Sequence, residues 1–273
     1  MLYYLITKIK AMKYIVFLLI LIFNNLNSSS QEKGIVYYGH IESPGMRSAA
    51  GPDLNAYLLF NNDKSYYVTA KDSLENEIKD KSLFSENNEP TAIHVGGSRT
   101  YRYGKQVFYN RIKDSLWWNQ RFKGNIYIAE KRPLINWKLE NETKKIGGFT
   151  AHKATGGFRG RNYTAWYILE IPVPYGPWKL QGLPGLILEA YDERKEMYLY
   201  FKSLEYPSKN KEIISQLKRL KSDSNGWQTI KDFEKMLRTS IERAHNNNII
   251  NAEKYGMKKP KKRVFSDIYI ESF

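Results

Sequence analysis

The chain has 273 residues and no cysteine, which excludes disulfides, thiol catalysis, cysteine-zinc sites and attachment as a lipoprotein through an N-terminal cysteine. Its length allows one large domain or two small ones, and its 14% aromatic content favours β structure. The formal net charge of +15 favours anionic partners such as lipid headgroups or polysaccharide; solvated lysine faces on a generally basic protein are the alternative. No nucleic-acid recognition pattern is present.

The first thirty residues have the three-part pattern of a secretory signal peptide. Three lysines between positions 8 and 13 form a positive region, Ile15–Phe23 is an unbroken apolar run, and Asn24–Ser30 is small and polar. A membrane-spanning helix needs about 20 apolar residues, more than this run supplies. We therefore expect cleavage before Gln31, export to the periplasm or the outer-membrane periphery, and no transmembrane span in the mature chain.

Residues 34–130 carry the alternation and turn signals of successive β-hairpins. Turn residues at Asn61–Lys64, Gly104-Lys105 and Lys123-Gly124 indicate hairpin tips. The polar stretch Lys71–Asn88 is either a short helix or an excursion between strands. The strands expected in this part of the chain are 34–40, 55–60, 65–70, 101–109, 117–122 and 125–130.

A short strand at 135–140 and a turn at 141–143 precede two longer strands, Lys145–Ala154 and Tyr163–Pro172, which a glycine-rich segment at 156–161 joins. Turn signals at intervals of about eight to twelve residues are typical of an antiparallel sheet built from sequential hairpins.

The stretch Tyr175–Leu188 concentrates three glycines, two prolines and Trp178. Glycine reaches positive φ without a Cβ clash, and proline fixes φ, so this composition predicts a rigid, bent corner. Two further strands follow, Leu186–Tyr191 and Glu196–Leu204, with apolar residues at both odd and even positions. Both faces of these strands are therefore expected to be covered.

The apolar spacing becomes helical in the last third of the chain. One helix is expected in Asn210–Ser222, and a second begins at Thr229, where Asp232 completes a capping box. Asn246–Asn248 is expected to end the second helix, and Val264–Phe273 to form a last strand.

The predicted fold class is thus mainly β with minor α. It is a curved, open-barrel-like antiparallel sheet of sequential hairpins, with two helices from the C-terminal half packed on it. We expect the signal peptide at 1–30 to be followed by a single domain at 31–273, because no low-complexity linker divides the chain.

The segment Gly182-Leu183-Pro184-Gly185-Leu186-Ile187 is the eponymous motif of the GLPGLI family of secreted proteins from Bacteroidetes, which this chain resembles. The resemblance covers about residues 37–206, with a family core of about 137–206. Other matching positions stand in the order that the family shows, namely Trp137, Lys145–Gly148, Lys153-Ala154, Arg159-Gly160-Arg161, Ala165-Trp166-Tyr167, Ile171-Pro172 and Gly176-Pro177-Trp178.

The family has no assigned biochemical activity. Many members end in a segment like Asn-Pro-Ile-Glu, where this chain has Tyr269-Ile270-Glu271. The members are similar in pattern to periplasmic open β-barrel proteins that carry lipoproteins or other apolar cargo, which is an analogy at the level of the fold.

Recognisable catalytic and metal motifs are absent from the sequence. The four histidines, His40, His94, His152 and His245, have no metal-ligand spacing, so structural roles are favoured over metal binding. There is no nucleophile elbow and no P-loop. We therefore expect no metal, no cofactor and no enzymatic activity, and a hydrolase is disfavoured.

The candidate binding residues are Arg159, Arg161, Trp166 and Trp178. An arginine pair on a tight turn can clamp a carboxylate or phosphate. The favoured alternative is that one arginine stacks on Trp166 while the other pairs with a surface acid. Trp178 either closes the end of the sheet or stacks on a ligand.

These features predict an exported, non-catalytic protein of the cell envelope that binds apolar or anionic cargo. The alternative is a protein–protein interaction module that assists an envelope transporter or secretion machine. A large exposed apolar patch in place of a pocket would favour that alternative.

Overall fold

The computed structural model describes residues 33–75, 100–121, 124–214, 217–219, 226–262, 269 and 271. The expected signal peptide at 1–30 lies outside these residues. The described elements are, in chain order, β1 (Gly34–Glu42), β2 (Asp53–Phe60), β3 (Lys64–Thr69), the 3₁₀ turn η1 (Asp72–Leu74), β4 (Lys105–Asn110), β5 (Ser115–Arg121), β6 (Asn125–Lys131), β7 (Lys138–Ile146), β8 (Phe149–Phe158), β9 (Arg161–Ile168), β10 (Leu186–Asp192), β11 (Met197–Glu205), β12 (Trp227–Gln228) and α2 (Ile230–Lys254).

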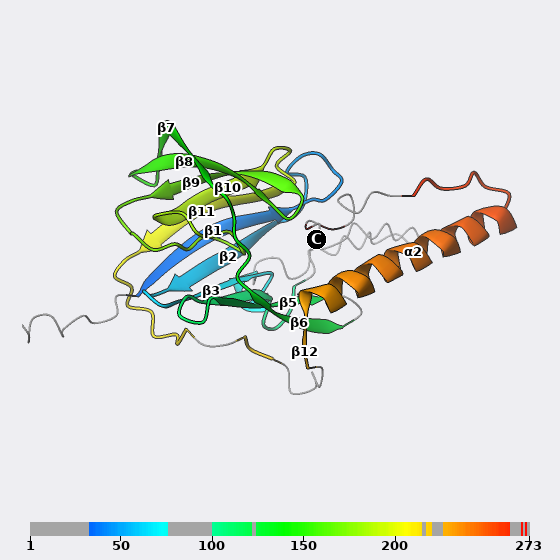
Figure 1. Cartoon of the computed structure of the whole chain (residues 1–273), viewed down its shortest axis with the longest axis horizontal. Coiled ribbons are helices and arrows are strands. Elements are labelled where there is room, and N and C mark those ends of the chain that lie inside the picture. Colours follow the sequence, from blue (N-terminus) through cyan, green and yellow to red (C-terminus); the bar gives the residue numbers. More distant parts are fainter. Residues whose placement is uncertain are drawn as a thin grey trace, which may run out of the picture. The chain divides into compact units, whose positions relative to one another are not determined.

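The strands form one mainly antiparallel sheet in the order β12-β6-β5-β4-β3-β2-β1-β11-β10-β9-β8-β7 (Figure 1). One run of hairpins, β2 to β6, lies on one side of β1, and a second run, β7 to β11, lies on the other side. Strand β1 pairs antiparallel with β11, more than 150 residues later in the chain. The expected fold class, a mainly β sheet of sequential hairpins, is confirmed, and the short β12 is the parallel exception.

The connection between β6 and β7 requires the sheet to curve. In sheet order these strands are ten positions apart, which in a flat sheet is about 48 Å. The chain from Lys131 to Lys138 has seven residue steps, which reach at most about 25 Å. The sheet must therefore bend until its two ends approach each other, yet within the described residues β12 and β7 remain unpaired ends, so it is not closed into a barrel.

The glycine- and proline-rich segment from Tyr175 forms the expected corner between β9 and β10. Backbone bonds join Gly182 N to Pro174 O at 3.0 Å and Ile187 N to Tyr175 O at 2.9 Å. Gly182 has a φ of 94°, and a Cβ on Gly185 would lie 1.9 Å from the carbonyl oxygen of Ile168. The motif therefore needs glycine at one position for its conformation and at the other for close backbone approach.

Two expected turns and one expected strand differ from the structure. Gly104-Lys105 is no hairpin tip, because β4 begins at Lys105. Residues 141–143 lie inside β7, where the register against β8 shifts and a bulge absorbs them. The expected strand Lys145–Ala154 is two strands, because Gly147-Gly148, with φ of 55° and 89°, forms a two-residue hairpin turn.

Buried side chains form three clusters on the sheet. The largest contains residues of β1–β10, together with Phe233 and Leu237 of α2. A second joins β8–β11 to Leu180 and Leu183 of the corner. In the third, Ile214 and Leu217 cover strands β1–β4 and β6. Both surfaces of much of the sheet are therefore covered, as the two-faced apolar pattern predicted.

The expected helix at Asn210–Ser222 is wrong for its described residues, since 210–214 and 217–219 have no helical structure. The backbone N–H and C=O groups of Lys218 instead bond to the side-chain amide of Gln106, at 2.8 and 2.9 Å. These tertiary hydrogen bonds take the place of helical ones. One described helix therefore accompanies the sheet, where two were expected.

Helix α2 begins as predicted. The side chain of Thr229 accepts a hydrogen bond from Asp232 N, and the Asp232 carboxylate accepts from Thr229 N, which completes the capping box. Asn246–Asn248 does not end the helix, which continues to Lys254 and stops before Gly256, whose φ is 65°. No helix of the described residues combines the length and the apolar character needed to cross a membrane. The expected last strand lies outside the described residues except for Tyr269 and Glu271.

Candidate anion-binding site

Arg159 and Arg161 flank Gly160 at the turn between β8 and β9. The turn is tighter than the loop expected at 156–161, because β8 runs to Phe158 and pairs it with Arg161. Arg159 and Gly160 have φ of 47° and 78°, the signature of a two-residue hairpin turn. Arg161 is the first residue of β9, so the two guanidinium groups leave the hairpin at different points and reach different partners.

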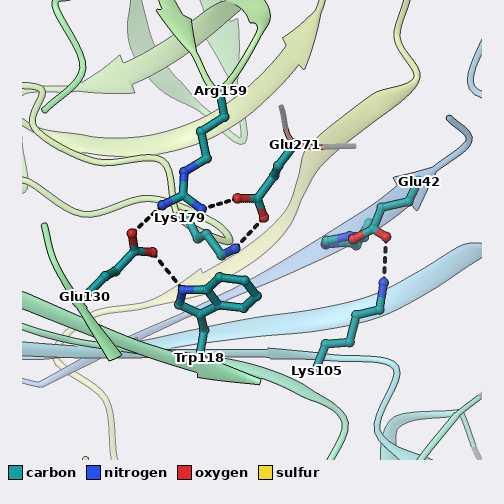
Figure 2. A network of polar contacts seen from close by, with 8 residues as sticks. Glu42, Lys105, Trp118, Glu130, Arg159, Lys179 and Glu271 are labelled. Carbon is teal, nitrogen blue, oxygen red and sulfur yellow. Dashed lines mark hydrogen bonds and ion pairs between the residues drawn. The ribbon is translucent and has the colours of Figure 1, made fainter. Parts of the chain in front are cut away.

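Arg159 belongs to what we call the Arg159 cluster, formed with Trp118, Glu130, Lys179 and Glu271 (Figure 2). One guanidinium nitrogen lies 2.5 Å from a Glu130 oxygen, and the other pairs with Glu271. The second Glu130 oxygen accepts a hydrogen bond from the Trp118 indole at 2.7 Å. Burial alone would lower the pKa of Arg159, but the carboxylates of Glu271 and Glu130 raise it. This arginine therefore stays charged in a nearly solvent-free position.

Lys179, in the glycine- and proline-rich corner, pairs with the same Glu271 carboxylate as Arg159. Its ammonium group pairs with the second oxygen of Glu271, and both side chains are at most 2% exposed. The ammonium also lies 3.2 Å from the centre of the Trp118 ring, a close cation–π contact. Burial lowers the pKa of Lys179 to about 8, although Glu271 opposes the shift. Two buried cations from separate elements thus meet on one carboxylate.

Glu130 and Glu271 differ in how they are held. Glu130 belongs to β6, and the indole of Trp118 on the neighbouring strand β5 orients it. Glu271 lies outside every described strand and helix, so its carboxylate is held by Arg159 and Lys179. Glu130 is therefore held by its strand and by the Trp118 indole, and Glu271 by two cationic side chains.

A second polar group extends this face of the sheet toward β1. His40 contacts the Tyr67 hydroxyl at 2.7 Å through Nδ1 and Glu42 at 2.8 Å through Nε2, and Lys105 pairs with Glu42 at 2.6 Å. Burial would raise the pKa of Glu42, but Lys105 and His40 hold it well below its usual range. Directly opposed residues of paired strands share a face, and the register places these side chains on the face that carries Trp118 and Glu130.

A small pocket of about 20 Å³ separates the two groups. Its lining includes Glu42, Lys105, Lys179, Tyr269 and Glu271. A volume of this size holds about one water molecule. The two groups are thus close neighbours across a small space that Tyr269 and Glu271 help to line.

Arg161 forms a separate Arg161 cluster with Asp192 and Glu196, at 2.5 and 2.6 Å. Each carboxylate also accepts a backbone N–H, from Met197 at 3.1 Å for Asp192 and from Arg47 at 2.8 Å for Glu196. Asp192 and Glu196 bracket the turn between β10 and β11, so Arg161 ties the start of β9 to that turn. A hollow of about 170 Å³ lies beside it.

The two candidate tryptophans lie in different surroundings. Trp178, with a φ of 57°, packs edge-to-face on Phe158 at 5.8 Å and lies 5.1 Å from the Lys179 ammonium. Trp166 is buried, and the cation over its ring is Lys144, at 4.4 Å. The alternative in which one arginine stacks on Trp166 and the other pairs with a surface acid differs from the structure, because both arginines are less than 10% exposed and pair with buried carboxylates.

The sequence therefore pointed to Arg159 and Trp178 but not to the groups around them. Residues that it did not single out are Glu42, Lys105, Trp118, Glu130, Lys179 and Glu271. They come from distant strands and segments, and no local spacing connects them. The one sequence signal was the carboxylate of Glu271 in the segment matched to the ends of family members. Among the described residues no group of three or more histidines, aspartates or glutamates is arranged to hold a metal ion.

Comparison with known proteins supplies a partial match. Residues 159–189, from the Arg159 turn through most of β10, match a family described as "Protein of unknown function (Porph_ging)". None of the curated proteins matches this chain. The match covers too little of the chain to assign all of it to that family.

Two solved structures show weak similarity. "Structure of PNGF-II in P21 space group" has a TM-score of 0.47 at 15% identity and covers 75% of this chain and 33% of that one. "Structure of PNGF-II in C2 space group" has a TM-score of 0.43 at 16% identity, with 72% and 30% covered. This chain thus spans about a third of the length of those proteins, and a similarity this low carries no functional inference.

Proposed function

We propose that this protein is an exported, non-catalytic binding protein of the cell envelope, and that it holds a carboxylate-bearing ligand through Arg159 and Lys179. We further propose that the chain is of the GLPGLI type, on the Gly182–Ile187 motif and the matching positions around it. The observation that supports binding is the convergence of two buried cations on one carboxylate that belongs to no described strand or helix.

The electrostatics of the site favour an anion over a neutral ligand. Without the Glu271 carboxylate, Arg159 would keep its ion pair with Glu130, but the buried ammonium of Lys179 would lose its ion pair with Glu271. A buried, unmatched charge is costly, so this position favours occupation by a carboxylate. The fork of Arg159 and the point charge of Lys179 each contact a different oxygen, which is the arrangement that grips a carboxylate from two sides.

Apolar cargo receives less support than anionic cargo. The pocket beside the cluster is about 20 Å³, and a neighbouring one under the corner is about 10 Å³. Neither volume admits an acyl chain. The expectation of apolar or anionic cargo therefore narrows to an anionic group.

A catalytic use of the same face is the competing function, because His40 lies between Tyr67 and Glu42 as a base would between a nucleophile and an orienting acid. Two properties argue against it. Burial raises the pKa of Tyr67 and the negative charge of Glu42 adds to the shift, so the Tyr67 hydroxyl is not activated. Lys105 neutralises Glu42 in a 2.6 Å ion pair. We assign this group to structural support.

Calorimetric titration of the full chain carrying Glu271→Ala tests the binding function. N-acetyl-glutamate carries carboxylates, and N-acetyl-glutamine amide, in which both acid groups are amides, is the neutral match. We expect binding of carboxylates and none of the amide, and loss of binding when Arg159→Gln or Lys179→Met is added. Arg161→Gln is the matched control, since it removes a buried arginine from the same hairpin.

Three results would contradict the proposal. The first is equal affinity for acid and amide, the second is binding that survives Arg159→Gln, and the third is turnover of an esterase, peptidase or glycosidase substrate that His40→Gln abolishes. Export is tested separately. N-terminal sequencing of protein from the periplasmic fraction should begin at Gln31, and intact protein confined to the cytosol would refute export.

A further inference from the structure

Tyr269 and Glu271 enter the same buried site side by side. Glu271 pairs with Arg159 and Lys179. The ring of Tyr269 lies 5.8 Å from that of Phe233 on α2, and Phe233 in turn contacts Trp118 edge-to-face at 5.3 Å. Burial raises the pKa of the Tyr269 hydroxyl. Both residues line the pocket beside Lys105 and Glu42.

The spacing of these two residues defines the kind of segment that the site accepts. Residues two apart share a side in an extended chain, so an extended peptide with this spacing can present an aromatic ring and a carboxylate to the site together. The receiving surface has two parts to match them. Phe233 receives the ring, and Arg159 with Lys179 receives the carboxylate.

We propose that this surface is a recognition site for an acidic peptide with an aromatic residue two positions before a glutamate, and that the chain's own Tyr269 and Glu271 occupy it as an internal competitor. The proposal rests on the proposed function, whose anion site it uses, and it names the ligand class. A peptide is favoured over a lipid because the occupants described, Tyr269 and Glu271, are amino-acid side chains, and because the adjacent space of about 20 Å³ leaves no room for an acyl chain.

The exchange of one segment for the other is balanced in charge. A peptide glutamate replaces the Glu271 carboxylate between the same two cations, so no buried charge is left unpaired in the product. The internal segment has the advantage of tethering, with an effective concentration on the order of millimolar. A free peptide that makes the same contacts must compete against this tethered segment. Weakening the internal segment should therefore raise the apparent affinity of the free peptide by about tenfold or more.

Fluorescence anisotropy with a labelled peptide of the sequence Ser266–Phe273 tests the proposal. The peptide is titrated into the wild-type full chain and into the Glu271→Ala and Glu271→Gln variants. We expect binding at least about tenfold tighter to both variants than to wild type. Adding Lys179→Met should abolish it, whereas adding Arg161→Gln should not.

Altered peptides separate the two parts of the site. A peptide with glutamine in place of Glu271 should lose binding, and one with alanine in place of Tyr269 should bind about tenfold more weakly. Glu271→Gln keeps the shape of the side chain, so it gives a result even where Glu271→Ala fails to fold.

The outcomes also distinguish the peptide-recognition proposal from the proposed anion-binding function. If the Glu271 variants bind N-acetyl-glutamate but bind the peptide no more tightly, or if the tyrosine is dispensable, the peptide proposal is overturned and the anion site stands. If they bind neither, both proposals fail. Equal peptide affinity for wild type and variants would show that Glu271 is not a competitor.

Discussion

Arg159 and Arg161 are two residues apart on one hairpin, equally buried and each paired with two carboxylates, yet they serve different purposes. Arg161 joins neighbouring parts of the chain, because Asp192 and Glu196 bracket the adjacent β10–β11 turn. Arg159 joins parts that are distant in the sequence, because Glu130 lies on β6 and Glu271 lies near residue 273. The Arg161 pairing holds the start of β9 against the β10–β11 turn. The Arg159 pairing connects the two runs of hairpins, because it links the β8–β9 turn to β6.

The two clusters differ in which other groups bond to the carboxylates that pair with each arginine. Asp192 and Glu196 also accept backbone N–H groups, so their positions are part of the framework. Glu271 instead bonds to two cationic side chains, which a ligand carboxylate can also satisfy. This difference is why we propose the Arg159 cluster, and not the Arg161 cluster, as the binding site.

The largest effect is expected from Arg161→Met. It leaves Asp192 and Glu196 buried without their cation, and removal of one partner of a buried ion pair costs about 3–5 kcal/mol. Denaturant unfolding followed by circular dichroism measures this loss. If stability is unchanged, the Arg161 cluster is not the structural clamp that we describe.

Arg159→Met should cost somewhat less, about 3 kcal/mol, because Glu130 keeps the Trp118 indole and Glu271 keeps Lys179. A double-mutant cycle sharpens the comparison. Arg159→Met and Glu271→Ala should be coupled by about 1 kcal/mol or more, and Arg161→Met and Glu271→Ala should be additive. Additivity in the first pair would mean that Arg159 does not act on Glu271.

Gly185→Ala should destabilise by about 1–3 kcal/mol, because a Cβ there would lie 1.9 Å from the Ile168 carbonyl oxygen. Gly157→Ala is the control, since its nearest neighbour would be 3.7 Å away. The corner carries Lys179, so Gly185→Ala should weaken anion binding and leave the Arg161 cluster unaffected. Calorimetry on the folded fraction checks this, and unchanged stability would mean that the corner backbone is free to shift.

Lys179 should make the Arg159 cluster sensitive to pH near 8. Its folded-state pKa of about 8 lies below the ordinary value of 10.5, so the unfolded chain binds more protons between these values. The stability that Lys179 contributes therefore rises with pH from about 8 to 10.5 and is lost as the pH falls through 8. The unfolding free energy of wild type minus that of Lys179→Met should rise over this pH range. The affinity of the site for a carboxylate ligand should fall over the same range, because Lys179 loses its charge.

Thr229→Ala should have the smallest effect, about 1 kcal/mol, from loss of the capping box. Because Phe233 lies in the first turns of α2 and contacts both Trp118 and Tyr269, fraying of this end should weaken peptide binding more than binding of N-acetyl-glutamate. Equal weakening of the two would argue against an aromatic part of the site.

Local pattern was sufficient for the parts of this fold that local chemistry controls. Strands β1–β3, β5, β6, β10 and β11 and the capping box of α2 follow from alternation and turn residues within a few positions. The corner follows from glycine and proline, whose backbone limits act at the residue itself. Errors arose where tertiary contacts overrode local preference. Gln106 takes the hydrogen bonds of Lys218 that a helix would have used, and a bulge absorbs the turn-like residues 141–143.

By itself, the sequence determined the sheet class, the hairpin order, the bent Gly–Pro corner and the choice of Arg159 and Trp178 as residues of interest. Only the tertiary structure decided that Arg159 and Arg161 diverge, and that Lys179, Glu130 and Glu271 meet Arg159. The reason is physical. Hairpins and corners depend on neighbours in the chain, but an ion-paired site depends on which strands the curvature of the sheet brings together, and a register set by pairing between β1 and β11 has no local signature.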